Sequence, residues 1–316
     1  MPCEEGLGGC SGWEEREMRL TVIGSTALDD IETPFAKKKE ILGGSATYAS
    51  LSASFFTPVN LISVVGEDFP KRYITMFRRR KIDTEGLEVK KGKTFRWSAR
   101  YDYDLSHAET LDTQLNVFEG FRPVIPDKVD AKGNLLLANI DPELQSFIFH
   151  QIRPSGLVAC DTMNLWIEKS KKSLLKLLKK VDLFLLNDAE ARQLSGEANL
   201  LEAARYICSR GVKMLVIKKG EHGALFFSGG LRFMAPAYLL EKIIDPTGAG
   251  DTFAGGMMGY LSASGKITGK ILRRSLVYGS ILASFAVERF SAEGLRKTTR
   301  KDISRRYSHF EKLTRF

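Results

Sequence analysis

The chain contains few cysteines, few histidines and no long apolar segment. Its four cysteines, Cys3, Cys10, Cys160 and Cys208, form no C-x-x-C pair and have no histidine cluster at zinc-ligand spacing. This pattern argues against a disulfide framework and a structural zinc site, so we expect reduced thiols in a cytoplasmic protein. No apolar segment reaches the ~20 residues of a membrane-spanning helix, and no membrane association is expected.

The first residues also lack the basic and then apolar pattern of a signal peptide. Residues 1–17 are rich in Gly and Glu, which predicts a disordered N-terminal extension. Met18 directly precedes the first expected strand and would suit the start of a compact protein. Residues 18–316 are numerous enough for one large α/β domain with a small appendage.

The charge of the chain is unbalanced. The 316 residues include 47 Lys and Arg against 38 Asp and Glu, a formal net charge of +9. The basic residues are spread through expected helices such as 169–180 and 296–306. This distribution is typical of solvated helix faces, so nucleic acid is not an expected partner. The charge would equally attract a nucleotide or a sugar phosphate.

The most informative stretch is Asp245-Pro-Thr-Gly-Ala-Gly-Asp-Thr-Phe-Ala-Gly-Gly256. Gly248, Ala249 and Gly250 are small enough for their backbone N–H groups to face one point. A helix beginning near Asp251 would add the positive end of its dipole there, which predicts a phosphate site built from amides. Asp251 would be a carboxylate able to take a proton from an incoming hydroxyl. The alternative is a plain Gly-rich turn at a helix start, and the stretch does not fit the P-loop pattern G-x-x-x-x-G-K-[ST].

The same stretch resembles the C-terminal signature of the PfkB/ribokinase family of sugar and nucleoside kinases. The resemblance implies a ribokinase-like α/β fold, an αβα sandwich with a mostly parallel central sheet and a small β-sheet lid. It also implies transfer of the γ-phosphoryl group of ATP, bound with Mg²⁺, to a hydroxyl group. The roles that it implies are a general base for Asp251, stabilisation of the moving phosphoryl group for Gly248, Ala249 and Gly250, and nucleotide binding for Thr247.

Hydrophobic patterning agrees with such a fold. Short β-branched and apolar runs alternate with helical segments from residue 133 onward, as in a parallel sheet with helices on both faces. The expected strands are residues 20–24, 59–65, 134–138, 156–160, 182–186, 214–218 and 223–227. The expected helices are residues 73–81, 143–151, 166–178, 190–194, 200–210 and 271–290, with a small-residue helix after Gly44.

Two acidic residues follow the first expected strand, at the edge where open α/β sheets bind ligands. Asp29 and Asp30 suit a polyol, because an ionised carboxylate accepts hydrogen bonds from two hydroxyls. The resemblance places Asp29 at the position that holds substrate hydroxyls. A simple turn is the alternative.

The pair Gly43 and Gly44 resembles the N-terminal Gly-Gly signature of the family and is expected at the substrate. The family usually has Asn five residues after the first of these glycines, whereas this chain has Tyr48. The ring of Tyr48 would stack on a base or a sugar face, or else fill the core. The missing amide counts against ribose itself as the substrate.

Asn187 and Glu190 stand at the start of an expected helix. Their spacing fits a plain capping box. In the family, an Asn-x-x-Glu at this place orders the magnesium and phosphate shell, so the resemblance implies that Glu190 binds the metal through water.

Asp161 and Asn164 lie near a family Asp-Pro-Asn motif, but the Asn is displaced by one residue and no role is assigned. The resemblance also implies nucleotide contacts for Lys218, where many members have Thr, and for Gly220, Gly223 and Ser280.

Residues 94–103 alternate between aromatic and polar side chains, which predicts a strand of an exposed antiparallel sheet. One side carries Phe95, Trp97, Ala99, Tyr101 and Tyr103, and the other Arg96, Ser98 and Arg100. We expect lid elements around residues 92–120 that cover the substrate and a second subunit, giving a homodimer through the lid. Packing inside one chain is the alternative, and Arg96, Arg100 and His107 receive no specific role.

These observations predict an ATP-dependent kinase that phosphorylates a hydroxyl of a small sugar. A nucleoside kinase of the same fold is the first alternative. The second is a non-catalytic sugar or nucleotide sensor, against which the presence of Asp251, Asn187 and Glu190 argues, because a binder needs no general base.

Overall fold

The computed structural model describes residues 19–105 and 108–315. The expected extension 1–17, Met18 and His107 lie outside these described residues. In the described part, a ten-stranded sheet has the order β14-β13-β12-β11-β10-β9-β1-β4-β5, with β6 paired to β4. Its strands are β1 Leu20–Ile23, β4 Val59–Gly66, β5 Ile82–Asp83, β6 Leu87–Lys90, β9 Asn134–Leu137, β10 Val158–Asp161, β11 Leu183–Asn187, β12 Met214–Lys218, β13 Ala224–Ser228 and β14 Leu231–Ala235.

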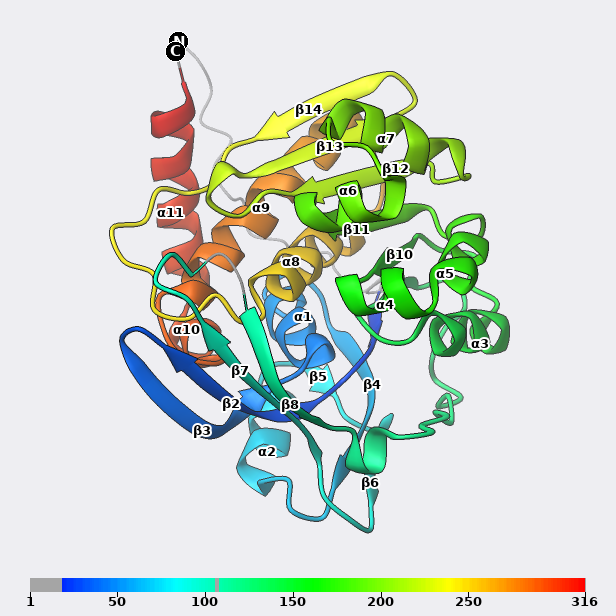
Figure 1. The fold of residues 1–316 in the computed structure, drawn as a ribbon, viewed down its shortest axis with the longest axis vertical. Coiled ribbons are helices and arrows are strands. Elements are labelled where there is room, and N and C mark those ends of the chain that lie inside the picture. The colour runs from blue at the N-terminus through cyan, green and yellow to red at the C-terminus, as the bar shows by residue number, and fades with distance from the viewer. Residues whose placement is uncertain (1–18, 106–107, 316) are drawn as a thin grey trace, which may run out of the picture.

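The large sheet is parallel from β12 to β5 and antiparallel at the β12-β13-β14 edge. Helices cover both faces, as Figure 1 shows. Successive residues of β11 point to opposite faces of the sheet. Leu183 and Leu185 are therefore buried in one apolar core, and Phe184 and Leu186 are buried in the other. The first core is formed with α1 Ser45–Ala53, α2 Lys71–Arg79, α8 Ala249–Ala263, α9 Gly269–Val287, α10 Glu293–Lys297 and α11 Arg300–Thr314. The second is formed with α3 Pro142–Ile152, α4 Asn164–Lys169, α5 Lys171–Leu178, α6 Asp188–Ser195 and α7 Leu200–Ser209.

One expected helix is two helices in the structure. Residues 166–178 belong to two helices, α4 and α5, that meet at Ser170. Ser170 has φ −129° and ψ 27° and therefore leaves the helical region. None of the helices in the described part of the chain is long and apolar enough to cross a bilayer.

The small residues of α1 have a packing role that the sequence interpretation missed. All nine residues of α1 are buried, and the helix packs against α8. A Cβ atom at Gly255 of α8 would lie 2.1 Å from the carbonyl oxygen of Ala49. The glycine therefore allows the two backbones to approach closely, which fixes the helix that carries the Gly-rich signature.

A second, four-stranded sheet lies beneath α8 and α10 in Figure 1, in the order β3-β2-β7-β8. Its strands are β2 Ala27–Thr33, β3 Ala36–Gly43, β7 Phe95–Tyr101 and β8 Ala108–Gln114. The small sheet was predicted around residues 92–120, but two of its strands come from residues 27–43, for which no strand was predicted. It is also mixed, because β7 runs parallel to β2 and antiparallel to β8.

The alternating aromatic face of β7 is largely covered within the chain. Phe95 packs against Phe118, with ring centroids 5.7 Å apart, and Ala99 is fully buried. Tyr101 accepts a hydrogen bond of 3.1 Å from the hydroxyl of Thr247. Tyr103 lies beyond β7 and is 92% exposed. Phe95, Ala99 and Tyr101 therefore pack inside the chain, which was the alternative to covering the substrate or a second subunit.

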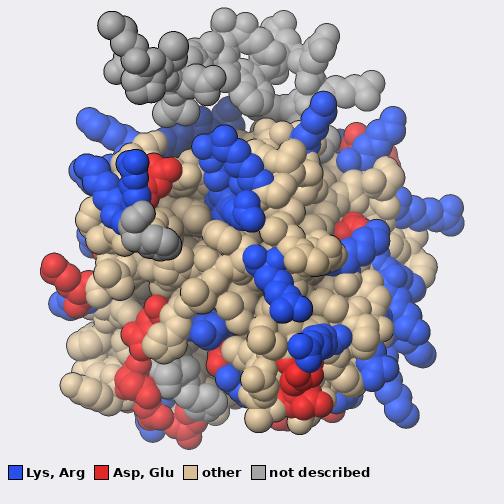
Figure 2. Space-filling model, turned by 90° about the horizontal axis from the view of Figure 1, so that it is seen from above, with Lys and Arg blue, Asp and Glu red and all other residues tan. Residues whose placement is uncertain are grey.

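The positive charge is distributed as expected. Figure 2 shows separate groups of Lys and Arg on the face seen from above rather than one continuous stripe. Some basic side chains of the chain are paired, such as Arg306 with Glu288 at 3.0 Å. The surface therefore gives no support for a nucleic-acid groove on this face.

Candidate active site

The loop of residues 245–251, called the signature loop below, joins a buried carboxylate to the start of α8. Asp245 holds the loop, because its Oδ1 accepts from the amide of Thr247 and its Oδ2 from the amide of Ser291, both at 2.9 Å. Gly248 is the N-cap of α8 with φ 74°, a left-handed conformation that favours glycine. A Cβ atom at Gly248 would lie 2.3 Å from the ring of Tyr48.

The anion site differs from the predicted one in two respects. The helix begins at Ala249, so Asp251 lies within its first turn rather than at its start. The amide of Ala249 donates to the carbonyl of Pro246 at 3.1 Å. Among the described residues, no such bond is formed by the amides of Gly248 and Gly250, which lie at the positive end of the 15-residue helix α8 and could therefore bind an anion.

Asp251 is partly exposed at the mouth of this turn. Burial raises its pKa to about 7, the nearby Asp161 acts in the same direction, and Lys218 opposes them. A carboxylate with such a pKa is a stronger base than a solvated aspartate and still half ionised at neutral pH. The position and the pKa both suit a general base.

Asp161 and Lys218 form a buried ion pair beside the signature loop. Nζ of Lys218 donates to both carboxylate oxygens of Asp161, at 2.8 and 3.0 Å. A Cβ atom at Gly250 would lie 3.1 Å from Nζ, so the ammonium group is next to the amide turn. Lys218 was predicted at the nucleotide, whereas Asp161 had no assigned role. Its place at the carboxyl end of a parallel strand was the signal that could have identified it.

Asn187 and Glu190 form the capping box that was the alternative interpretation. The amide of Glu190 donates to Oδ1 of Asn187, and the amide of Asn187 donates to Oε2 of Glu190, both at 2.7 Å. Burial raises the pKa of Glu190 to about 7, although Lys218 opposes this. The capping box uses Oε2 and leaves Oε1 of Glu190 for another partner, so a structural and a ligand role are compatible.

The residues present fit a metal ion that arrives with the nucleotide. Within residues 19–105 and 108–315, no group of three or more His, Cys, Asp or Glu side chains is arranged to hold a metal ion. Mg²⁺ keeps several waters and binds phosphate oxygens readily. Glu190 beside the signature loop would then contact metal-bound water rather than the ion itself.

The turn after β12 has the backbone that its glycines predict. Gly220 and Gly223 have φ 55° and 84°, and a Cβ atom at Gly223 would lie 2.0 Å from the carbonyl oxygen of Ala235. Ser280 of α9 is buried, and its hydroxyl donates to the carbonyl of Pro236 at 3.4 Å. Ser280 thus packs on the segment after β14.

Asp29 lies in β2 rather than in a loop after the first strand. It is buried, and its Oδ1 has no hydrogen-bond partner among the described residues. Burial raises the pKa of Asp29 well above its ordinary value, with Asp245 and Asp251 adding to the effect. A Cβ atom at Gly43 would collide with this carboxylate, and Gly44 has φ 94°. The unpartnered Oδ1 of this buried carboxylate is an atom that a hydroxyl of a ligand would satisfy.

Tyr48 does not lie on an open surface. It is 2% exposed and its ring packs under Gly248. This burial agrees with the core-filling alternative and not with stacking on a ligand. The ring supports the signature loop from below, while Tyr101 of the small sheet contacts the same loop through Thr247.

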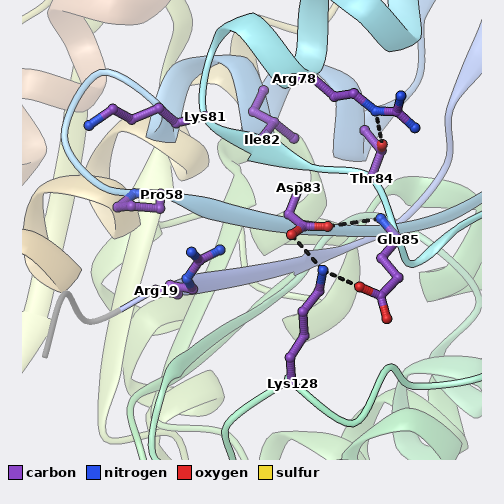
Figure 3. Close-up of a pocket in the computed structure, with 9 residues that line it drawn as sticks. All are labelled: Arg19, Pro58, Arg78, Lys81, Ile82, Asp83, Thr84, Glu85 and Lys128. Atoms are coloured by element: carbon purple, nitrogen blue, oxygen red, sulfur yellow. Dashed lines mark hydrogen bonds and ion pairs between the residues drawn. The ribbon is translucent and has the colours of Figure 1, made fainter.

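One hollow in the described part of the chain lies away from these residues. It measures about 630 Å³ and is formed at the amino ends of β4 and β5, the opposite edge of the sheet from Asp161 and Lys218. Figure 3 shows that its Lys128 is held by Asp83 and Glu85 and that Arg78 donates to Thr84. Its charged groups largely satisfy one another, so the chemistry points to the signature loop.

Comparison with known proteins gives relatives that are sugar or nucleoside kinases. A cytidine kinase of Thermococcus kodakarensis is 30% identical over 244 residues, which cover 76% of this chain and 87% of that protein. A nucleoside kinase of Methanocaldococcus jannaschii is 27% identical and covers 92% of this chain and 97% of its own.

Solved structures share the fold. The crystal structure of the Methanocaldococcus jannaschii nucleoside kinase has a TM-score of 0.73 and 22% identity, covering 92% of this chain and 98% of that one. An aminoimidazole riboside kinase from Salmonella enterica, complexed with aminoimidazole riboside and an ATP analogue, has a TM-score of 0.75 and 17% identity, with 92% and 99% covered. The ribokinase-like fold that the sequence predicted is thus confirmed. The model of the pfkB family carbohydrate kinases matches residues 28–298, and the chain therefore belongs to the pfkB family of sugar and nucleoside kinases.

Proposed function

We propose that the protein transfers the γ-phosphoryl group of MgATP to a hydroxyl group of a nucleoside. The observation that carries this proposal is the carboxylate of Asp251 in the first turn of α8, beside the amides of Gly248 and Gly250 and with a pKa raised by burial to about 7. A general base and an anion site for the same phosphoryl group are the two parts that this reaction needs.

The acceptor hydroxyl gives its proton to Asp251, and its oxygen forms a bond to the γ-phosphorus. The bond from the γ-phosphorus to the oxygen that bridges to the β-phosphate breaks, and ADP leaves with that electron pair. The amides of Gly248 and Gly250 stabilise the charge on the moving phosphoryl group. Asp29 fixes the acceptor, because its buried carboxylate accepts hydrogen bonds from hydroxyls.

Mg²⁺, when bound, neutralises phosphate charge and aligns the γ-phosphoryl group for in-line attack. Glu190, held in its capping box by Asn187, would contact the hydration shell of the ion. Thr247 and the turn at Gly220 and Gly223 bind the nucleotide, Lys218 lies at its phosphate end, and Ser280 lines the base side of its site.

A nucleoside is preferred over a free sugar as the acceptor. Among the relatives that cover more than two thirds of the chain, the cytidine kinase and the nucleoside kinase are 30% and 27% identical, whereas an inositol 3-kinase of Arabidopsis thaliana is 21% identical over 85% of the chain. A ribokinase of Staphylococcus aureus matches only 37% of it. The sequence interpretation placed a small sugar first and a nucleoside as the first alternative, and we propose the nucleoside because of the names of the cytidine kinase and the nucleoside kinase. Release of ADP should be measured with cytidine, other nucleosides, ribose and fructose. Turnover of free sugars alone would overturn the nucleoside.

The non-catalytic sensor is the competing function. It requires binding of nucleotide or sugar without ADP release, together with nucleic-acid binding that weakens steeply with salt. Absence of ADP release with every acceptor in that panel would favour the sensor.

We also propose a homodimer in the cytoplasm, where MgATP is available. The side chains that would form the contact are the large apolar ones left exposed on the small sheet and its loops: Phe35, Tyr103 and Leu111. Leu111→Lys should weaken the dimer, whereas Val124→Lys, which changes an exposed residue outside this sheet, should not. Sedimentation of a wild-type monomer at micromolar concentration would reject the dimer.

A further inference from the structure

The ion pair of Lys218 and Asp161 bridges the carboxyl ends of three neighbouring strands. Asp161 ends β10 and Lys218 ends β12, and β11 lies between them in the sheet. The side chains are 3% and 15% exposed. Asp161 is fixed in turn by the amide of Thr162, which donates to its Oδ1 at 2.9 Å. The pair is therefore a rigid charged group at the ligand-binding edge of the sheet.

The ammonium group of Lys218 faces the signature loop. A Cβ atom at position 250 would lie 3.1 Å from Nζ, and Gly250 carries one of the two anion-binding amides. Asp161 occupies only part of the bonding capacity of Nζ, because an ammonium group has three N–H donors. Burial alone would lower the pKa of Lys218, but Asp161 and Glu190 outweigh it and keep the amine protonated.

Stability does not account for this pair. Two charges lose hydration on burial, and their attraction returns little net free energy of folding. The chain also carries a surface pair of the same residue types beside the other end of β12, where Lys213 contacts Asp182 at 2.7 Å and is 73% exposed. The two pairs differ in place, because only the buried one lies beside the anion-binding amides.

We propose that Lys218 is a catalytic residue that contacts the transferred phosphoryl group, and that Asp161 is the positioning residue that holds Lys218 against Gly250. This inference rests on the phosphoryl transfer proposed above. Only Gly248 and Gly250 supply amides in this turn, since the amide of Ala249 donates to Pro246. Lys218 then adds a fixed positive charge where negative charge gathers as the bond to ADP breaks.

The test uses the full-length protein and four variants, one of which is Asp161→Asn alone. Lys218→Met removes the charge and retains the length, but leaves Asp161 buried without its partner. The double variant Asp161→Asn/Lys218→Met removes both charges, so no buried charge is left without a partner and the variant should still fold. Lys213→Met is the control, because it breaks the surface pair beside the same strand. Each protein is assayed for kcat and for KM of ATP and acceptor, for the dissociation constant of ADP, and for thermal unfolding.

We expect the double variant to unfold close to the wild-type temperature and to lose at least ~10²-fold in kcat, the usual loss for one transition-state donor. Its dissociation constant for ADP should change by less than about 3-fold, because the contact is to the transferred group. Asp161→Asn introduced alone should lower kcat, yet cause no further loss when Lys218 is already Met. Lys213→Met should retain wild-type kcat.

A double variant with wild-type kcat would overturn the proposal and make the pair structural. An unchanged kcat with weaker ADP binding would overturn it too, because Lys218 would then bind nucleotide in the ground state only. A wild-type protein that releases no ADP with any nucleoside or sugar would instead reject the proposed function, so the two failures are distinguishable.

Discussion

Replacing Asp251 with Asn is expected to abolish turnover and to stabilise the fold. Burial raises the pKa of Asp251 from its ordinary value of 3.8 to about 7. A carboxyl group whose pKa is higher in the folded state favours folding below its unfolded pKa, and this contribution is lost as the pH rises through the folded value. At pH 8 the native protein therefore holds an ionised carboxylate that its surroundings disfavour.

The size of this destabilisation follows from the two pKa values. A difference of about 3 pH units at ~1.4 kcal/mol per unit gives an upper limit of ~4 kcal/mol. Because Asp251 is partly exposed to solvent, we take about half of this limit, ~2 kcal/mol. Asn has nearly the same shape without the charge, so Asp251→Asn should raise the free energy of unfolding by that amount at pH 8. The gain should shrink as the pH falls toward 5.

The same variant should lose at least ~10²-fold in kcat, the scale for loss of a general base. Wild-type kcat/KM should rise about 10-fold between pH 6 and pH 8, as the ionised fraction of a group with pKa about 7 increases. Glu190 has a similar pKa, so Glu190→Gln is the control and should keep this profile. Urea unfolding at two pH values and a coupled ADP assay measure both effects. Near-normal turnover would remove Asp251 from the mechanism, and a less stable variant at pH 8 would refute the electrostatic argument.

Three further predictions concern packing, metal and lid. Gly255→Ala should lower the free energy of unfolding in urea by ~2 kcal/mol through overpacking against α1, whereas Gly269→Ala, which meets only one atom at 3.9 Å, should not. Glu190→Gln should raise the magnesium concentration needed for half-maximal rate and leave acceptor KM unchanged; an identical magnesium titration would reject its contact with the hydrated ion. Tyr101→Phe removes the hydrogen bond from the small sheet to the signature loop, and a loss of ~1 kcal/mol should raise acceptor KM about 5-fold with ATP KM constant. Tyr103→Phe is its exposed control, and equal effects of the two would show that the hydrogen bond is irrelevant.

The sequence by itself determined the features whose geometry is local. The run of residues 245–256 contains its own left-handed glycine, Gly248, and its own helix start within a few residues, so a turn leading into a helix could be predicted directly. Asn187 and Glu190 likewise carry both halves of a capping box three residues apart. The alternation of buried strands with helices fixed the αβα layering, because a strand buried on both faces needs a continuous apolar run.

Only the tertiary structure decided what depends on residues far apart in the chain. Asp161 and Lys218 are 57 positions apart, and no local pattern shows that β10 and β12 flank the same strand. Tyr48 is buried because the signature loop, about 200 residues later, closes over its ring. The aromatic alternation of β7 predicted a strand correctly, but whether that face contacts solvent, a second subunit or the same chain depends on which surface folds against it. The contact of Tyr101 with Thr247 supplies that surface from within the chain, because burying the rings there removes apolar area from water without a partner.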